Sequence, residues 1–162
     1  MTAIRVAFAG VQRGSTTLHE AEVIDEYGSD QERSAARLLD VETSWDQVPD
    51  SFIEGCTTAL CYLDPESWRF YIPAYMIWSL KNFRVSNSVV SDFTIYTFNP
   101  SGSDASGREY HMARYRMLDE AQSRAVCLFL RYMLANEDRA DGSAANLALT
   151  EYWGVFCDNQ EA

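Results

Sequence analysis

The chain has 162 residues, of which 47% are hydrophobic and 13% aromatic. This composition supports one folded domain over residues 1–162 and excludes a chain that is disordered throughout. The formal net charge of −11 disfavours binding to nucleic-acid phosphates or to anionic lipids. The sequence has no uncharged apolar run of about 18 residues, so we expect no membrane span. Because Arg5 interrupts the N-terminal apolar stretch, residues 1–10 do not resemble a signal peptide, and we expect a cytoplasmic protein.

Several predicted helices start at capping boxes, in which a side chain and a Glu or Gln three residues later satisfy free backbone N–H groups. Two such boxes begin at Thr17 and Ser29. With the apolar spacing, they predict a first helix that stops near Gly14, two helices that follow the boxes, and a fourth after Pro49. The side chains that these four helices are predicted to bury are Ile4, Ala7, Phe8 and Val11, then Leu18, Ala21, Ile24 and Tyr27, then Ala35, Leu38 and Leu39, and finally Phe52, Cys56, Leu60 and Leu63.

The next segment contains two prolines with different expected effects. Asp64 followed by Pro65 is typical of a helix start. Pro73 would remove a backbone hydrogen bond from a longer helix and would clash with the preceding turn. We therefore predict a short turn over 65–71 and a separate helix from Pro73 to about Phe83. That helix is apolar nearly all round, which predicts that it is the central and most buried one.

Residues 88–98 fit both a helix and a strand. We favour a helix because the neighbouring segments are helical, and the alternative is one short strand pair formed by 92–98 and 110–118. Glycine and serine predict a flexible loop over 101–107. A further helix buries Val126, Phe129, Leu130 and Met133, and a last one over about 143–153 carries Leu147, Leu149 and Trp153. The predicted fold class is all-α, with seven to nine helices.

The four cysteines do not match a known redox or zinc pattern. Cys56 and Cys61 are five residues apart, which fits neither a Cys-x-x-Cys pair nor a zinc knuckle. Apolar residues surround Cys127, and Cys157 lies near the C-terminus. We therefore expect buried free thiols in a reducing compartment.

The sequence contains no recognisable catalytic set. Its two histidines, His19 and His111, have no carboxylate or second histidine at a metal-ligand spacing. Nucleophile elbows, phosphate loops and dinucleotide fingerprints are absent from the sequence. We therefore expect no catalytic residue, no metal and no cofactor, and the sequence favours a protein that is not an enzyme.

Negative charge is concentrated in one part of the chain. The segment from Glu20 to Glu54 contains eleven acidic residues and only two basic ones, Arg33 and Arg37, which gives it a net charge of −9. One interpretation is that these acids are simply the solvated faces of helices. The other is that they attract a basic partner protein, most concretely a toxin that an immunity protein or antitoxin neutralises. The residues predicted to bind this partner are Glu20, Glu22, Asp25, Glu26, Asp30 and Glu32.

Residues 62–83 hold seven aromatic side chains around a single arginine, Arg69. The spacing is that of a helix, which favours a structural core whose tyrosine and tryptophan edges reach polar partners. The alternative function, small-molecule binding or enzymatic activity, places a pocket here. The residues predicted to line it are Trp68, Arg69, Tyr71, Tyr75 and Trp78. The sequence does not fix the oligomeric state.

One stretch resembles the signature of a bacterial family of small, largely helical proteins of unknown function. The resemblance rests on Leu63-Asp64-Pro65-Glu66-Ser67-Trp68-Arg69-Phe70-Tyr71-Ile72-Pro73-Ala74-Tyr75-Met76 and on the later Leu118-Asp119-Glu120-Ala121-Gln122 and Phe129-Leu130-Arg131-Tyr132-Met133. It covers most of the region from about Leu18 to Met133. It implies a helical fold and supplies no catalytic residues that could be transferred to this chain.

Overall fold

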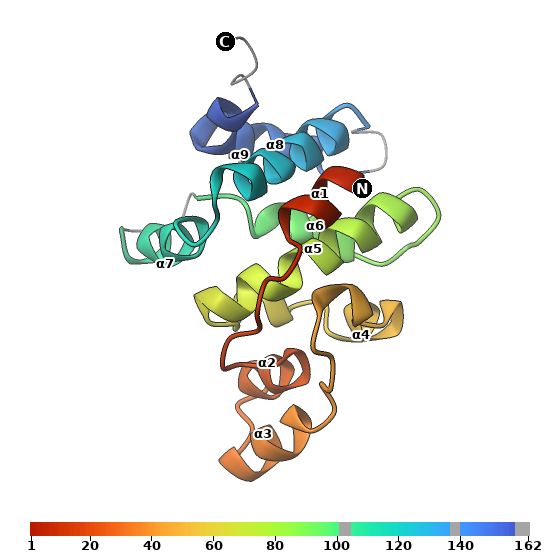
Figure 1. The fold of residues 1–162 in the computed structure, drawn as a ribbon, viewed down its shortest axis with the longest axis vertical. Coiled ribbons are helices and arrows are strands. Elements are labelled where there is room, and N and C mark those ends of the chain that lie inside the picture. The colour runs from red at the N-terminus through yellow and green to blue at the C-terminus, as the bar shows by residue number, and fades with distance from the viewer. Residues whose placement is uncertain (101–104, 137–139, 158–162) are drawn as a thin grey trace.

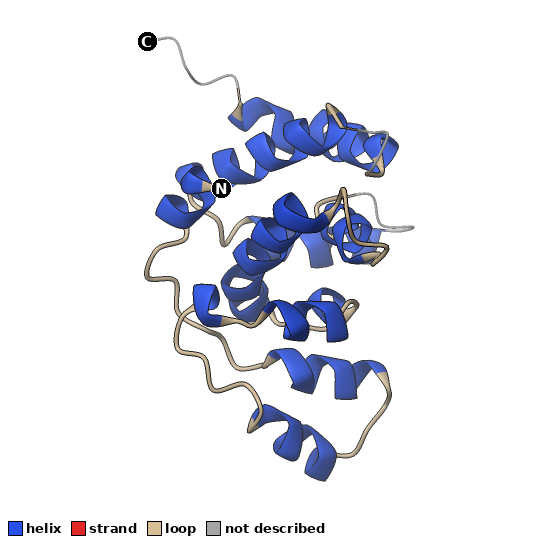
Figure 2. Ribbon diagram, turned by 90° about the vertical axis from the view of Figure 1, so that its right-hand side faces the viewer, coloured by secondary structure: helices blue, strands red, loops and turns tan. Residues whose placement is uncertain are grey.

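The computed structural model describes residues 1–100, 105–136 and 140–157. In these ranges every regular element is a helix and no strand forms (Figure 2). The predicted all-α fold is confirmed. The α-helices are α1 (Thr2–Ala7), α2 (Leu18–Asp25), α3 (Asp30–Arg37), α4 (Asp50–Gly55), α5 (Pro65–Asn82), α6 (Val90–Tyr96), α7 (Ala105–Tyr115), α8 (Glu120–Leu134) and α9 (Gly142–Glu151), and the 3₁₀ helices are η1 (Trp45–Gln47), η2 (Ala59–Cys61) and η3 (Trp153–Phe156).

The helices are stacked along the long axis of the molecule (Figure 1). The pair α2 and α3 forms one end, α5 crosses the middle, and α8 and α9 form the other end. Helix α3 packs against α2, whereas α8 packs against α9, η3 and α1. The α2–α3 pair is therefore an outer layer whose far side faces solvent.

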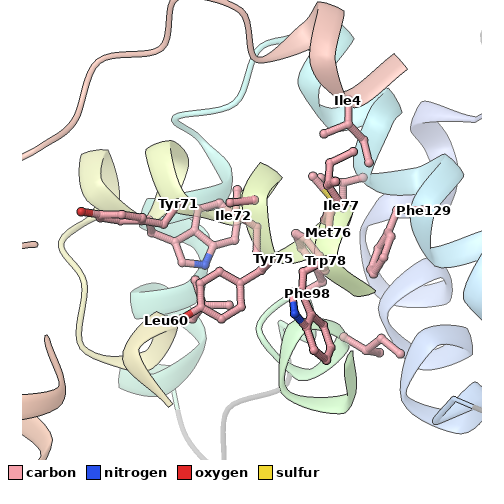
Figure 3. Packing of buried hydrophobic residues seen from close by; sticks show 14 of the residues in the cluster. Ile4, Leu60, Tyr71, Ile72, Tyr75, Met76, Ile77, Trp78, Phe98 and Phe129 are labelled. Atoms are coloured by element: carbon pink, nitrogen blue, oxygen red, sulfur yellow. The ribbon is translucent and has the colours of Figure 1, made fainter. Parts of the chain in front are cut away.

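Helix α5 is the central helix, as the sequence predicts. Its two tryptophans, Trp68 and Trp78, and almost every other residue from Ser67 to Ser79 are buried. The side chains of α5 lie between Leu60 on one side and Phe129 on the other (Figure 3). The predicted break at Pro73 is wrong, because the helix runs through Pro73 without interruption. We attribute this to burial on all sides, which outweighs the loss of one backbone hydrogen bond.

The predicted alternative strand pair is also wrong. Residues 90–96 form α6, and residues 105–115 form α7, so the extended conformation expected over 110–118 does not occur. In α6 the buried positions are Val90, Ser91, Thr94 and Ile95, which share one helical face. Of the loop predicted over 101–107, residues 101–104 lie outside the described residues and residues 105–107 belong to α7.

Several apolar side chains that were predicted to be buried are exposed. They lie on the outer layer. There α3 packs mainly against α2, and Ala36 is its buried residue. Leu38 is 78% exposed, and Tyr27, Ala35 and Leu39 are exposed as well. The predicted fourth helix is divided at Cys56 into α4 and η2, although its apolar residues Cys56, Leu60 and Leu63 are buried as predicted.

Two of the four cysteines form a disulfide, which contradicts the prediction of free thiols. Cys127 of α8 is bonded to Cys157, just after η3, with a Cα–Cα distance of 5.8 Å. Cys56 is free and buried, whereas Cys61 is free and exposed. The disulfide fixes the end of the described chain to α8. Among the described residues, no helix is long and apolar enough to cross a membrane.

Candidate functional site

Glu20 lies inside the α2–α3 layer rather than on its surface. Its side chain is 1% exposed. Arg37 Nε donates to Glu20 Oε2 at 2.9 Å, and Arg33 Nη2 donates to Oε1 at 3.3 Å. Burial alone would raise the pKa of Glu20, but the hydrogen bonds from Arg37 and the other donors outweigh it and lower this pKa. Glu20 therefore holds α3 against α2 and is not accessible to a partner.

Glu22 and Asp25 lie at the edge of the same layer, where they share a hydroxyl donor. Thr58 Oγ1 donates to Asp25 Oδ2 at 2.9 Å and lies 3.4 Å from Glu22 Oε1. Partial burial, followed by the neighbouring charges of Asp25 and Glu26, raises the pKa of Glu22. A hydrogen bond to Asp25 raises the pKa of Tyr62 to about 12. Glu22, Asp25 and Glu26 thus bring three acidic side chains together at the C-terminal end of α2.

The remaining three acids predicted to bind a partner, Glu26, Asp30 and Glu32, are exposed. Glu32 completes the capping box of α3, because Ser29 N and Ser29 Oγ both donate to Glu32 Oε2 at 2.7 Å. Asp30 lies 3.7 Å from Arg33 in an exposed ion pair, an arrangement that contributes little to stability. Of the six acids, Glu26 and Asp30 are therefore the two whose charge contributes least to the stability of the fold.

Tyr27 has the most unusual conformation on this layer. It follows α2 in a left-handed backbone conformation, with φ of 58°, and is the one such non-glycine residue in the described ranges. Tyr27 N donates to Ile24 O at 3.1 Å and Gly28 N donates to Val23 O at 2.8 Å, the hydrogen-bond pattern of a Schellman motif. Glycine normally occupies this position, because a side chain there costs about 1–2 kcal/mol. The ring is 97% exposed, so packing within this chain does not offset the cost.

The neighbours of Tyr27 define one contiguous feature, which we call the Tyr27 surface. It combines exposed aromatic area with negative charge at the junction of α2 and α3. Tyr62 belongs to it because its side chain is hydrogen-bonded to Asp25. The Tyr27 surface consists of Glu22, Asp25, Glu26, Tyr27, Asp30 and Tyr62.

The aromatic residues predicted to line a pocket are part of the core instead. Trp68, Tyr71, Tyr75 and Trp78 are at most 1% exposed. Two of the polar edges are used within the protein, since Trp68 Nε1 donates to Thr97 Oγ1 at 2.8 Å and the Tyr75 hydroxyl donates to a backbone carbonyl. Trp78 Nε1 is buried without a partner among the described residues. The structural interpretation of this segment therefore holds for these four residues.

Arg69 points away from that core into a separate cleft of about 440 Å³. Its Nε donates to Gln122 Oε1 at 3.0 Å. Arg13, Glu66 and Asp119 contribute the other charged side chains of the cleft, and its walls include no aromatic residue. The predicted pocket, in which Arg69 anchors a ligand against tyrosine and tryptophan rings, is therefore not formed.

A family model described as a family of unknown function, DUF6714, matches residues 1–155 of this chain. The chain belongs to this family. No curated protein and no solved structure matches the chain significantly. Membership confirms the resemblance to a family of unknown function, while the diagnostic value of the motif around Arg69 and a bacterial origin stay predictions.

The DUF6714 match extends from α1 into η3 and so includes the whole Tyr27 surface. The family description assigns no activity, so the function has to be argued from the surface chemistry of this member. Within the described residues, no group of three or more His, Cys, Asp or Glu side chains could hold a metal ion.

The sequence interpretation missed Tyr27 as a surface residue of this DUF6714 member. Helical spacing placed it on the buried stripe of α2, but the helix ends two residues earlier, at Asp25. The signal that could have identified it is Gly28. A Cβ atom at Gly28 would clash with the Val23 side chain, so the glycine is required there and the left-handed position falls to Tyr27.

Proposed function

We propose that this protein is a non-catalytic binding protein that captures a basic protein partner through the Tyr27 surface. The observation that supports this most strongly is Tyr27 itself. Its ring is exposed, and its backbone has a left-handed conformation that is unfavourable for any residue with a side chain. Strained conformations of this kind cluster at functional sites. Tyrosine is also among the residues that dominate binding energy at protein interfaces.

The charge of the surface indicates what the partner is like. Arg33 and Arg37, the two basic residues of the segment 20–54, contact the buried Glu20, so they neutralise a charge inside the layer. Arg33 also pairs with Asp30, but among the described residues no basic side chain lies within ion-pair distance of Glu22, Asp25 or Glu26. The potential of these three acids is therefore not neutralised by a paired cation. A basic surface would be attracted by this potential and would bind faster at low salt.

The first prediction separates stability from binding at Tyr27. Tyr27→Gly is expected to raise the free energy of unfolding by about 0.5–1 kcal/mol, because relief of the left-handed backbone exceeds the extra entropy of glycine in the unfolded chain. The same change should weaken capture of the partner about 30-fold or more, as for a central interface tyrosine. Urea unfolding measures the first effect, and titration of the purified partner measures the second.

A matched control is Tyr132→Ala, which removes another exposed tyrosine from α8 at the opposite end of the molecule. This control should leave binding unchanged. If Tyr27→Gly stabilises the fold and the partner still binds with wild-type affinity, Tyr27 does not belong to the interface.

The second prediction concerns the charge. The double variant Glu26→Lys/Asp30→Lys should slow association with the partner about tenfold at low ionic strength and flatten its dependence on salt. The control is Glu120→Lys/Glu151→Lys, which changes the net charge equally but lies on α8 and α9. Stopped-flow or surface-binding kinetics between about 20 and 500 mM salt, a range in which screening changes strongly, measure both. If both double variants slow association equally, the effect depends on net charge alone, which would contradict a localised interface.

The more specific form of this proposal is an immunity protein or antitoxin that acts in the cytoplasm on a basic toxin. Affinity purification from the host should yield one stoichiometric basic protein, which the Tyr27→Gly bait fails to retain. Expression of that protein alone should inhibit growth, and coexpression of this chain should restore it. A captured protein that is harmless when expressed alone would leave the binding function standing and contradict the antitoxin role.

A further inference from the structure

A cavity of about 380 Å³ lies among η2, α6 and α7. Its volume is within the range of small-molecule sites, and its walls are mostly apolar. The residues that define its chemistry are Cys61 of η2, Phe93 and Tyr96 of α6, and Tyr110, His111 and Arg114 of α7.

Arg114 is a buried cation without a paired acid. It is 1% exposed, and no carboxylate of the described residues lies within ion-pair distance of it. Its Nη2 donates to Leu63 O at 2.8 Å, to Cys61 O at 3.1 Å and to the Tyr110 hydroxyl, and the guanidinium lies 4.1 Å from the centre of the Tyr110 ring. Its Nε has no hydrogen-bond partner among the described residues. Buried guanidinium groups are normally paired with acids, because an uncompensated charge is costly.

His111, which also lines the cavity, carries a second nitrogen without a partner in the described structure. It precedes Arg114 by three residues on α7, so the two side chains lie on one helical face. His111 Nδ1 is buried and has no partner within the described part of the chain. Burial, followed by the charge of Arg114, lowers the pKa of His111, so the imidazole is neutral at pH 7. Arg114 and His111 thus each contribute one nitrogen that is unpartnered within the described ranges, and one ligand with two acceptor oxygens can satisfy both.

We propose that this cavity binds the carboxylate group of a small organic acid. The carboxylate accepts hydrogen bonds from Arg114 Nε–H and from His111 Nδ1–H, the two nitrogens to which the described residues offer no partner, and the apolar body of the acid packs against Phe93 and Tyr96. One guanidinium beside a neutral imidazole carries a single positive charge, which matches a monoanion and not a doubly charged phosphate ester. This inference does not depend on the function of the Tyr27 surface.

The site is one of binding rather than of covalent chemistry. Although Cys61 as a residue is exposed, the protein atoms around its thiol desolvate it and raise its pKa, and the opposing effect of Arg114 is smaller. Cys61 is therefore a thiol at neutral pH and not an activated nucleophile. Because it is free and lines the cavity, it serves as a reporter of occupancy.

The experiment uses phenylacetate as the probe and phenylacetamide as its neutral counterpart. Phenylacetate, expected to bind with a Kd of about 1–10 mM, should raise the Tm and shift the His111 Cε1–H resonance. At ten times its Kd it should slow alkylation of Cys61 by iodoacetamide about tenfold. Phenylacetamide should do none of these, since it cannot compensate the charge of Arg114.

Three variants test the assignment of the residues. Arg114→Met should weaken phenylacetate binding at least about tenfold, through loss of charged hydrogen bonds. Phe93→Trp should fill the cavity and block binding while leaving the contacts of Arg114 intact. It provides the test if Arg114→Met does not fold. Arg69→Met, which changes the half-buried arginine of the other cleft, should bind phenylacetate as the wild type does.

Several outcomes would overturn the proposal. Equal responses to phenylacetate and phenylacetamide would show that the charge of the ligand is not recognised. Inorganic phosphate that protects Cys61 where phenylacetate does not would show that the site takes a different anion. No response to phenylacetate at about 50 mM, well above the expected Kd, or full binding by Phe93→Trp would show that the cavity is not a carboxylate site.

Discussion

Replacement of Asp64 by alanine is expected to lower the free energy of unfolding at pH 7 by about 3 kcal/mol, because it removes several charged hydrogen bonds at once. Asp64 caps α5 by accepting from Ser67 N at 2.9 Å. It also accepts from Thr16 N at 2.8 Å and from Ser15 Oγ at 2.9 Å. The carboxylate therefore ties the connection between α1 and α2 to the start of the central helix.

The control for this prediction is Asp119→Ala, which removes the N-cap of α8. Asp119 accepts from Gln122 N at 2.8 Å but does not join two distant segments in this way, so its loss should cost about 1 kcal/mol. Gly14→Ala provides an independent test of the same junction. A Cβ atom at Gly14 would lie 2.6 Å from Ser67 N and would displace Asp64. Equal destabilisation by Asp64→Ala and Asp119→Ala would show that Asp64 acts as a cap alone.

The contribution of Asp64 should depend on pH in a defined direction. Burial would raise the pKa of Asp64, but the hydrogen bonds from Ser67, Thr16 and Ser15 outweigh it and hold this pKa well below its usual range. The stability that follows from a lowered carboxyl pKa is fully present above the unfolded value of about 3.9 and is lost as the pH falls toward the folded value. The difference between wild type and Asp64→Asn should therefore shrink below about pH 4. A difference in urea midpoints that is constant from pH 7 to pH 3 would contradict this.

The predictions that succeeded rest on interactions within a few residues. The capping box at Ser29 forms as predicted, because the donor and acceptor are three residues apart and need no tertiary information. The buried stripe of α8, including Val126 and Met133, is also present. Short-range geometry of this kind can be read directly from the sequence.

The predictions that failed depend on which neighbours a helix has. Leu38 and Leu39 fit a helical stripe, but α3 is an outer helix and nothing in the described structure covers them. The prediction of a break at Pro73 took into account the one lost hydrogen bond but not the burial of α5 on all sides. Glu20 resembled the other acids of its segment, yet it is the buried partner of two arginines. In each case the deciding contact joins residues that are far apart in the sequence or is absent altogether.

The same limit applies to the two sites. The acidic composition of the segment 20–54 identified the region of the Tyr27 surface but not its tyrosine. The Arg114 cavity was missed because its walls come from three elements, and because a buried cation without an acid cannot be recognised until burial is known. A short spacing did place His111 and Arg114 on one helical face, but their lack of partners is a property of the fold.

Reduction of the Cys127–Cys157 disulfide is expected to lower the free energy of unfolding by about 3.5 kcal/mol. The bond closes a loop between residues 30 apart in the sequence, and the loss of that constraint on the unfolded chain gives this magnitude. Urea unfolding of the wild type with and without dithiothreitol measures the effect. Cys157→Ser should match the reduced wild type and should not respond to dithiothreitol.

Cys61→Ser is the control, since Cys61 is free and exposed and its removal should leave the response to dithiothreitol intact. Four titratable thiols in the denatured, unreduced protein would show that the bond does not form. The redox state also tests the predicted location, because disulfides persist in oxidising compartments and are rare in the cytoplasm. If trapping of thiols in living cells finds Cys127 and Cys157 reduced, the protein works in the cytoplasm without this contribution to stability. If they are found oxidised, the expectation of a reducing compartment fails, and a basic partner should then be sought outside the cytoplasm.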